Sequence, residues 1–407
     1  MSELQAHSPL GASGAYRWMV CPGSVGHSAG VIDPESEFAA LGTAAHALAS
    51  LCLTSGDEID AWLLIGEWVY EGEIVGPGPS PEDMPHLEQV IHIDKGMADA
   101  VQVYLNAVRY EHPDQNQGNT WVERKFHCPD IHELFYGTAD FVHYDEAKST
   151  LHVWDYKHGA GIVVDVFANP QLMYYACGAL TDLRLWKVAK RIVLHVAQPR
   201  GWHSDGPLRE WSITKGELAN WLDDVLVPAM DRAQTSTDTA SGDHCRFCPA
   251  RWRACPQLVA DEKELTKLMA KMKEKGGAKK LSHKDIARLL DLGEVMKISI
   301  KAARENGFAR AEGGAKIPGW KLVKARSNRE FKETAEKAAI KKFGKDKAFT
   351  TPELKSPAKI DTLPGGKKFT TEYAFKPEKG MQLVQASDAR NEAGPSTRSM
   401  FKPQHNN

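Results

Sequence analysis

The sequence predicts an α/β protein built on a mixed central β-sheet with helices on its faces. Four short runs rich in β-branched and aromatic residues have the composition of strands: residues 119–127, 134–144, 150–158 and 190–198. A helix-length segment, residues 169–182, lies between the third run and the fourth and has Pro170 in its first turn. The order strand–strand–strand–helix–strand is typical of an α/β core.

The part of the chain before this core, residues 1–110, is expected to be mostly helical. Residues 35–53 form the first helical candidate, with Ser36 as a plausible N-cap. Five apolar side chains recur there at helical spacing: Phe38, Leu41, Ala45, Leu48 and Cys52. Residues 85–110 form a second long candidate that begins with Pro85.

Changes in composition and residue pattern divide the rest of the chain into a core, an extension and a tail. The core, residues 111–260, ends with a helix over 215–233 and a cysteine cluster. The extension, residues 261–384, is expected to be basic and mainly helical. It contains a charged, loosely helical segment, an amphipathic helix, a strand and a short helix: residues 261–280, 282–308, 319–327 and 331–343. The polar tail, residues 385–407, has the composition of a disordered segment.

The overall composition is that of a globular protein, with 42% hydrophobic and 26% charged residues among 407. No run approaches the roughly eighteen apolar residues that a membrane helix needs. The N-terminus lacks both the basic start and the apolar stretch of a signal peptide. We therefore expect a cytoplasmic protein with no membrane partner.

The net charge of −2 hides an asymmetry. Residues 261–407 hold 33 Lys and Arg against 19 Asp and Glu, a net of +14, whereas residues 1–260 hold 18 against 34, a net of −16. Such a split indicates a segment that faces nucleic acid beside an acidic, metal-binding body. The alternative is a solvated, Lys-rich helical region.

The residues that carry chemistry lie within 137–175. Asp140 falls near the middle of one expected strand, and Asp155 and Lys157 end the next. Antiparallel neighbours bring two such carboxylates together, and hard divalent cations prefer oxygen ligands. Asp155 and Lys157 share one face of their strand. A lysine beside a cation and its water suits phosphodiester hydrolysis, although a lone Asp-x-Lys is more often a surface strand.

Three further residues extend this set. His46 lies on the first expected helix, where a histidine is more often structural than a ligand. Gln171 and Tyr175 are four residues apart and share one helix face directly after the metal-binding strand. There they would hydrogen-bond a phosphate or the lysine, or simply pack.

The ordered motifs resemble those of RecB-like PD-(D/E)XK nucleases, which include the RecB and AddB nuclease domains and CRISPR-associated RecB-type exonucleases. The matching residues are His46, Gly137-x-x-Asp140, Asp155-x-Lys157 and Gln171-x-x-x-Tyr175. Weaker matches are Glu123 on the preceding strand and Ser13, Cys21 and Pro22 in the N-terminal segment. The family often has Thr-Gly after the lysine, whereas His158 and Gly159 stand here.

The resemblance implies a restriction-endonuclease-like core. It also implies that Mg²⁺ or Mn²⁺ is held by His46, Asp140, Asp155 and the carbonyl of Tyr156. Lys157 would act on the attacking water, and Gln171 and Tyr175 would support it.

A cysteine triplet, Cys245, Cys248 and Cys255, closes the core, and Cys21 is the candidate for a fourth thiolate. Four thiolates suit an iron–sulfur cluster or structural zinc. The AddB-like branch carries a 4Fe-4S cluster bound by one N-terminal and three C-terminal cysteines, so the resemblance favours iron–sulfur. The remaining cysteines sit in apolar runs and are expected in the core: Cys52, Cys128 and Cys177.

The sequence thus favours a DNA exonuclease that acts on linear ends. A chain of this size with a basic extension also resembles phage-borne RecB-like proteins, regarded as recombination exonucleases that resect ends for a single-strand annealing partner. Two alternatives remain open. One is a non-catalytic DNA-end-binding or recombination accessory protein that keeps the nuclease fold. The weaker one is a zinc-ribbon regulator, based on the cysteine triplet alone.

Overall fold

The computed structural model describes residues 8–31, 37–55, 59–70, 72–76, 90–113, 118–253, 255–324, 329–331, 334–350, 353–361, 363, 365–375 and 381–385. The chain divides into two compact units, residues 1–299 and 300–407. The expected boundaries at residues 110, 260 and 384 stay predictions. The polar tail after residue 385 lies outside the described residues.

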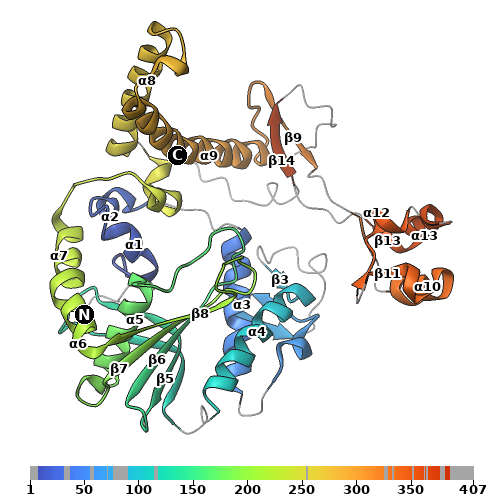
Figure 1. Ribbon diagram of the computed structural model, residues 1–407, viewed down its shortest axis with the longest axis horizontal. Helices are drawn as coiled ribbons and strands as arrows, with labels where there is room; N and C mark the ends of the chain where they lie inside the picture. The colour runs from blue at the N-terminus through green and yellow to red at the C-terminus, as the bar shows by residue number, and fades with distance from the viewer. Residues whose placement is uncertain are drawn as a thin grey trace. The chain divides into compact units, whose positions relative to one another are not determined.

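The first unit is built on a five-stranded mixed sheet in the order β4-β5-β6-β7-β8 (Figure 1). Its strands are β4 (Thr120–His127), β5 (Tyr136–Asp145), β6 (Thr150–Tyr156), β7 (Arg191–Ala197) and β8 (Leu208–Thr214). The pair β6–β7 is parallel and the other pairs are antiparallel. The parallel pair is joined through α5 (Pro170–Asp182), as a parallel connection requires. The expected α/β class and mixed sheet are confirmed.

Helices cover both faces of this sheet (Figure 1). On one face α5, α6 (Lys215–Trp221) and α7 (Val227–Thr235) join a core that includes Leu151 and Val153. On the other face α3 (Glu37–Thr54) and α4 (Lys95–Glu111) pack on Phe141, Trp154 and Tyr156. Alternate residues of β6 therefore serve different cores, and all seven are buried. Both faces of β6, the strand that carries Asp155, are therefore covered by packed side chains.

The expected helix over residues 85–110 needs correction at its N-terminal end. Residues 90–92 are not helical but form β3 (Val90–His92), which pairs with β1 (Trp68–Tyr70), itself paired with β2 (Glu73–Gly76). The helix α4 begins only at Lys95, because the carboxylate of Asp94 caps it by accepting a hydrogen bond from the Met97 N–H at 2.7 Å. Pro85 and Ser36 lie outside the described residues.

The remaining elements of the core follow the sequence closely. The expected helix over 215–233 is present as α6 and α7, joined by a π-helical segment, η4 (Leu222–Leu226). Thr214 and Glu217 form a capping box at its start. The edge strand β8 was not expected, because Arg209, Glu210 and Ser212 dilute its apolar residues.

Close packing between α5 and β4 gives a first test of the fold. A Cβ added to Gly178 of α5 would overlap the ring of Phe126. We expect Gly178→Ala to lower the free energy of unfolding by about 1–3 kcal/mol, because a packed core resists overfilling. Denaturant unfolding would measure this loss. Gly216→Ala in α6 is the control, since nothing lies within 4 Å of the added Cβ. Equal stability of the two variants would contradict the packing.

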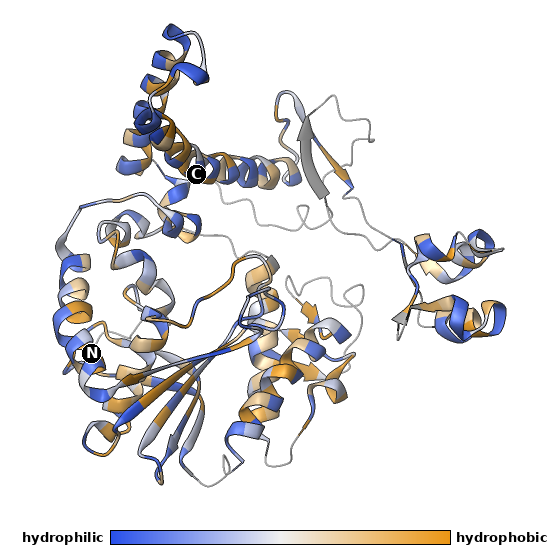
Figure 2. Cartoon of the chain, viewed as in Figure 1, coloured by the Kyte–Doolittle hydropathy of each residue, from blue (hydrophilic) through white to orange (hydrophobic). Residues whose placement is uncertain are grey.

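The elements after the cysteine region begin with α8 (Pro256–Glu274) and α9 (His283–Glu312), which confirm the expected helices. Hydrophilic residues cover much of α8 (Figure 2). In the second unit β9 (Trp320–Lys324) pairs with β14 (Met381–Gln385), and α10 (Ala335–Phe343) and α13 (Gly366–Tyr373) contribute to a small core around Phe369. Short elements complete this unit: β10 (Glu330–Phe331), α11 (Lys345–Ala348), β11 (Phe349–Thr350), β12 (Glu353–Leu354), α12 (Pro357–Ile360) and β13 (Ala374–Phe375).

None of the helices in the described part of the chain has the length and apolar character needed to cross a bilayer.

Candidate active site

The candidate site lies where β5 and β6 stop pairing. Their ladder ends at Phe141 and Trp154, just before the positions where Asp140 and Asp155 would face each other. The Asp140 carboxylate occupies the opening and accepts a hydrogen bond from the backbone N–H of Tyr156 at 2.8 Å. On its other side β6 remains paired with β7 to its last residue. The two aspartates therefore lie at a fork in the sheet, where β5 and β6 separate after the Phe141–Trp154 pair. The Asp140 side chain takes the place of a strand partner for the Tyr156 N–H.

A hydrogen-bonded network joins Asp155 and Lys157 to α5. The ammonium of Lys157 lies 2.9 Å from both carboxylate oxygens of Asp155 and donates to Gln171 Oε1 at 3.1 Å. The amide of Gln171 donates to Asp155 Oδ1 at 3.1 Å and to the Tyr175 hydroxyl at 3.0 Å. Asn169 caps α5 by accepting from the N–H groups of its first turn, which fixes where this helix face begins. The structure thus brings together the four residues that strand and helix periodicity aligned.

A second group surrounds Asp140 from other elements. His46 of α3 places its Nδ1 3.6 Å from Asp140 Oδ2 and 3.8 Å from Glu123 Oε1. One ligand atom from each of His46, Glu123 and Asp140 lies within 4.8 Å of the others. Asp155 is not in this group, so the expected ligands form two adjoining sets. Tyr156 contacts the site through its N–H, and the expected role of its carbonyl stays a prediction.

Glu123 is the residue that sequence reasoning did not place among the ligands. Its neighbours Val122 and Arg124 pair with β5 on either side of Asp140, so the antiparallel register brings Glu123 opposite that carboxylate. Its backbone has a φ of 47°, in the left-handed region that a non-glycine residue in a strand rarely adopts. Such strain costs about 1–3 kcal/mol and clusters at functional sites. The expected antiparallel pairing of the two strands could have placed Glu123 opposite Asp140. The strained backbone of Glu123 could not be predicted from the sequence.

The electrostatics of the site favour an added cation. Burial raises the pKa values of Asp140 and Asp155, and His46 and Lys157 offset this only in part. Burial alone would lower the pKa of His46, but Asp140 and Glu123 outweigh it and raise that pKa to about 9. The carboxylates therefore draw a proton to the imidazole, as expected where negative charge exceeds the available positive charge.

The donor set fits a divalent cation of the magnesium or manganese class. Asp140 and Glu123 offer carboxylate oxygens, the ligands that hard cations prefer, and His46 offers an imidazole nitrogen once a cation displaces its proton. The side chain of Glu123 is 38% exposed and that of His46 33%, so solvent reaches the site. A cation that keeps several waters can be accommodated there.

The family model described as "Protein of unknown function (DUF2800)" matches residues 7–391, which include every residue of the candidate site and most of the second unit. The chain belongs to this family. No solved structure matches it with statistical significance. The family description assigns no activity.

The cysteines of this DUF2800 protein fall into two sets. Cys52, Cys128 and Cys177 are buried in the hydrophobic cores of the first unit, as expected. The other four line one cavity: Cys21, Cys245, Cys248 and Cys255. Cys21 lies between α1 (Ala15–Trp18) and α2 (Ser24–Ser28), and the triplet spans η5 (Asp243–Phe247), η6 (Pro249–Trp252) and the start of α8. Chain segments more than 200 residues apart therefore meet at one cavity.

Hydrogen bonds close this junction between the segments. The Ala240 N–H donates to the Cys21 sulfur at 3.4 Å, and the Gly23 N–H donates to the Asp238 carbonyl at 2.8 Å. The Arg253 guanidinium donates to the carbonyls of Ala29 and Gly30 at 3.2 and 3.1 Å. Among the described residues, no three of the cysteine sulfurs lie within 4.8 Å of one another. The sulfurs surround the cavity without being assembled at the spacing of a single-ion site.

Proposed function

We propose that this DUF2800 protein is a metal-dependent DNA nuclease that hydrolyses phosphodiester bonds at linear DNA ends. One observation carries the proposal. At the fork between β5 and β6, the Asp155–Lys157 pair adjoins a three-ligand group centred on Asp140. A half-buried ammonium held against a buried carboxylate beside further acidic ligands suits the hydrolysis of an anionic ester.

The cation would be held by Asp140, Glu123 and His46. Asp155 would lie next to this group, paired with Lys157. When bound, it supplies charge neutralisation at the phosphate and a more acidic water. The chain's own contribution is orientation. The Tyr156 N–H fixes the Asp140 carboxylate, and the strained Glu123 backbone directs a second carboxylate toward the same point.

Lys157 would position the attacking water and take part in its deprotonation. Asp155 and Gln171 hold its ammonium from two sides, so its position does not depend on substrate. Gln171 in turn is held by the Tyr175 hydroxyl. Gln171 and Tyr175 therefore act as positioning residues for Lys157.

The order of motifs supports assignment to the RecB-like PD-(D/E)XK nucleases and hence DNA as the partner. A recombination exonuclease that resects ends for a single-strand annealing protein, in the cytoplasm of a bacterial or phage-infected cell, is the fuller form of the proposal. The competing function is a non-catalytic DNA-end-binding protein. The intact Asp155–Lys157 pair favours catalysis, because binding alone does not require an ammonium fixed against a buried carboxylate beside cation ligands.

We further propose that the four-cysteine cavity holds a 4Fe-4S cluster. Four thiolates lining one cavity suit iron–sulfur or zinc. Thiolates about 2.3 Å from a single zinc ion lie closer together than 4.8 Å, and no three of these sulfurs do so within the described chain. The wider spacing favours the larger group. Its role would be structural, since it would join residues 21–30 to residues 238–255.

Product analysis tests the proposed activity. End-labelled linear duplex and a covalently closed circle of the same sequence would be incubated with the full-length protein and Mg²⁺ or Mn²⁺. We expect mononucleotides or short fragments from the linear DNA, an intact circle, and no reaction with EDTA. Metal-independent binding to ends without cleavage would support the non-catalytic function instead.

The basic second unit gives a test of DNA binding. Residues 314–407 hold 20 Lys and Arg against 10 Asp and Glu, a net charge of +10. A chain that ends at Gly313, just after α9, should bind DNA more weakly, and its affinity should depend less steeply on salt, because fewer phosphates are neutralised. Fluorescence anisotropy across salt concentrations would measure both. An unchanged affinity and salt slope would show that these residues do not hold DNA.

A further inference from the structure

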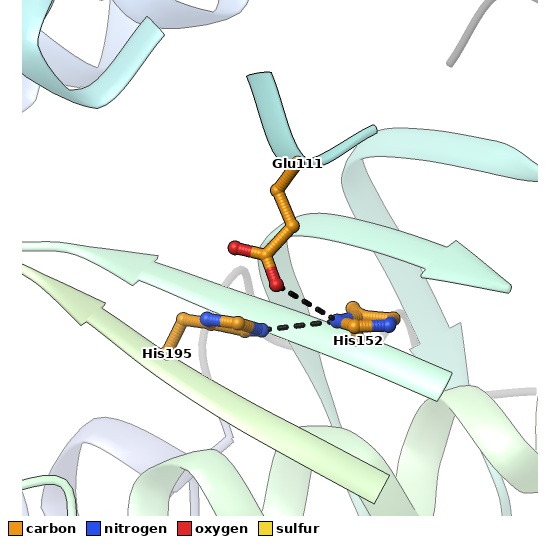
Figure 3. Close-up of side chains that lie close together, drawn as sticks. All are labelled: Glu111, His152 and His195. Carbon is orange, nitrogen blue, oxygen red and sulfur yellow. Dashed lines mark hydrogen bonds and ion pairs between the residues drawn. The ribbon is translucent and has the colours of Figure 1, made fainter. Parts of the chain in front are cut away.

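A second cluster of metal-ligating side chains lies apart from the candidate active site. It consists of Glu111, the last residue of α4, His152 of β6 and His195 of β7 (Figure 3). One ligand atom from each lies within 4.8 Å of the other two. His152 Nδ1 is 3.1 Å from His195 Nε2 and 3.9 Å from Glu111 Oε1. The three side chains converge from three different elements.

The sheet register explains this convergence. The strands β6 and β7 are parallel, and Trp154 is paired with His195, so His152 and His195 lie on one face and are offset by two residues. The ring of Trp154 stacks on that of His195, with the centroids 4.0 Å apart. Asp155 belongs to the alternate set of β6 residues and makes its contacts on the opposite side, with α5. The cluster also shares no residue with the His46, Glu123 and Asp140 group, and His152 pairs with His143, three residues along β5 from Asp140. It is therefore a different site from the candidate active site.

The two imidazoles present nitrogen lone pairs in a buried setting. His152 is 8% exposed and His195 2%. Burial lowers the pKa of His152 to about 4 and that of His195 well below its usual value, so both rings are neutral near pH 7. Neutral imidazole is the form that binds metals.

A carboxylate lies near His195 on the side of the ring away from His152. While its Nε2 faces His152, its Nδ1 faces Glu210 Oε2 at 4.0 Å. A carboxylate behind the non-ligating nitrogen is the usual outer partner of a metal-bound histidine. Two other histidines, His112 and His143, lie close by, and each has one ring nitrogen in a hydrogen bond with a residue outside the cluster. His112 Nε2 accepts from the Trp154 indole at 3.0 Å, and His143 Nδ1 contacts the Thr120 hydroxyl at 2.8 Å.

We propose that Glu111, His152 and His195 form a binding site for a divalent transition-metal ion of the zinc class. Two nitrogens and one carboxylate suit such a borderline ion, whereas Mg²⁺ prefers oxygen alone. Ligands about 2.0–2.1 Å from a tetrahedral zinc are roughly 3.3 Å apart. At the observed 3.1 and 3.9 Å, metal binding requires that neither of the two facing imidazole nitrogens carries a proton and that the Glu111 carboxylate moves slightly closer. That side chain is 35% exposed, which leaves room for water as a fourth ligand.

Binding there would tie the C-terminal end of α4 to the two central strands. The site is thus a structural clamp with its own metal, and it does not depend on the proposed nuclease activity.

Zinc binding by the full-length protein tests the proposal. EDTA-treated protein would be dialysed against ZnCl₂ in excess MgCl₂, added to compete for the candidate active site, and bound zinc would be counted per chain by elemental analysis. Glu111→Gln should bind one zinc fewer than the wild type at limiting free zinc, with affinity for that ion about 100-fold lower or more. His152→Gln should behave alike. The control Glu146→Gln alters an exposed carboxylate in the β5–β6 turn and should match the wild type.

Thermal unfolding gives a second readout. Zinc should raise the melting temperature of the wild type and of Glu146→Gln more than that of Glu111→Gln. If His152→Gln fails to fold, Glu111→Gln decides, because its partly exposed side chain tolerates the change. Wild-type zinc stoichiometry and affinity in Glu111→Gln would overturn the proposal. So would zinc binding by the wild type that disappears completely when Cys245 and Cys248 are replaced.

Discussion

Lys157→Ala is expected to lower the rate of DNA cleavage by about 10²–10⁴-fold, the usual contribution of a positioned proton-transfer group. The substitution removes the ammonium that lies 2.9 Å from Asp155 and leaves that buried carboxylate without its closest cation. Single-turnover cleavage of linear DNA at saturating metal would measure the loss. Asp140→Asn and Asp155→Asn should be impaired on a similar scale, because each removes a negative charge from the proposed cation site.

The control for this experiment is Lys125→Ala, which removes an exposed lysine on the edge strand β4. It should cleave at the wild-type rate. Circular dichroism must show that Lys157→Ala keeps the fold. A folded and fully active Lys157→Ala protein would refute the assignment of this site.

The second large effect is expected at the cysteine cavity. Anaerobically purified protein should be brown, with broad absorbance near ~400 nm, if the cavity holds an iron–sulfur cluster. Replacing Cys21 or Cys245 by alanine should bleach this colour and lower the melting temperature by about 10 °C or more, because metal-binding energy is then part of the folding energy.

Cys52→Ala is the matched control, since Cys52 is buried in a hydrophobic core away from the cavity. It should leave the colour unchanged. A colourless protein that holds one zinc ion per chain, and loses it when Cys21 or Cys245 is replaced, would show that the cavity binds zinc and not an iron–sulfur cluster. A protein that holds neither iron nor zinc, and that remains stable without Cys245 and Cys248, would contradict both the iron–sulfur and the zinc hypothesis.

The sequence was most informative where the periodicity of one strand or helix decides which candidate side chains share a face. Asp155 and Lys157 are two residues apart on a strand, and Gln171 and Tyr175 are four apart on a helix. Each pair had to share a face, and the structure joins both pairs in one network. The antiparallel approach of Asp140 and Asp155 also followed, because a short turn connects their strands.

Features that depend on several elements could not be predicted in this way. The approach of Glu123 to His46 requires the packing of α3 against the sheet and a strained backbone. The clamp of Glu111, His152 and His195 requires the parallel register of β6 and β7. The missed start of α4 is different, since the Asp94 cap was visible in the sequence, but the apolar residues before it belong to β3.

The junction between residues 21–30 and residues 238–255 has a consequence for how the protein is made. Arg253 reaches the carbonyls of Ala29 and Gly30, so this N-terminal segment cannot dock completely until some 220 later residues have left the ribosome. Contacts that span so much chain form slowly, because loop closure must come first. The sheet and its helices can assemble in the meantime. We therefore expect the N-terminal segment to remain sensitive to protease during synthesis and to become protected last.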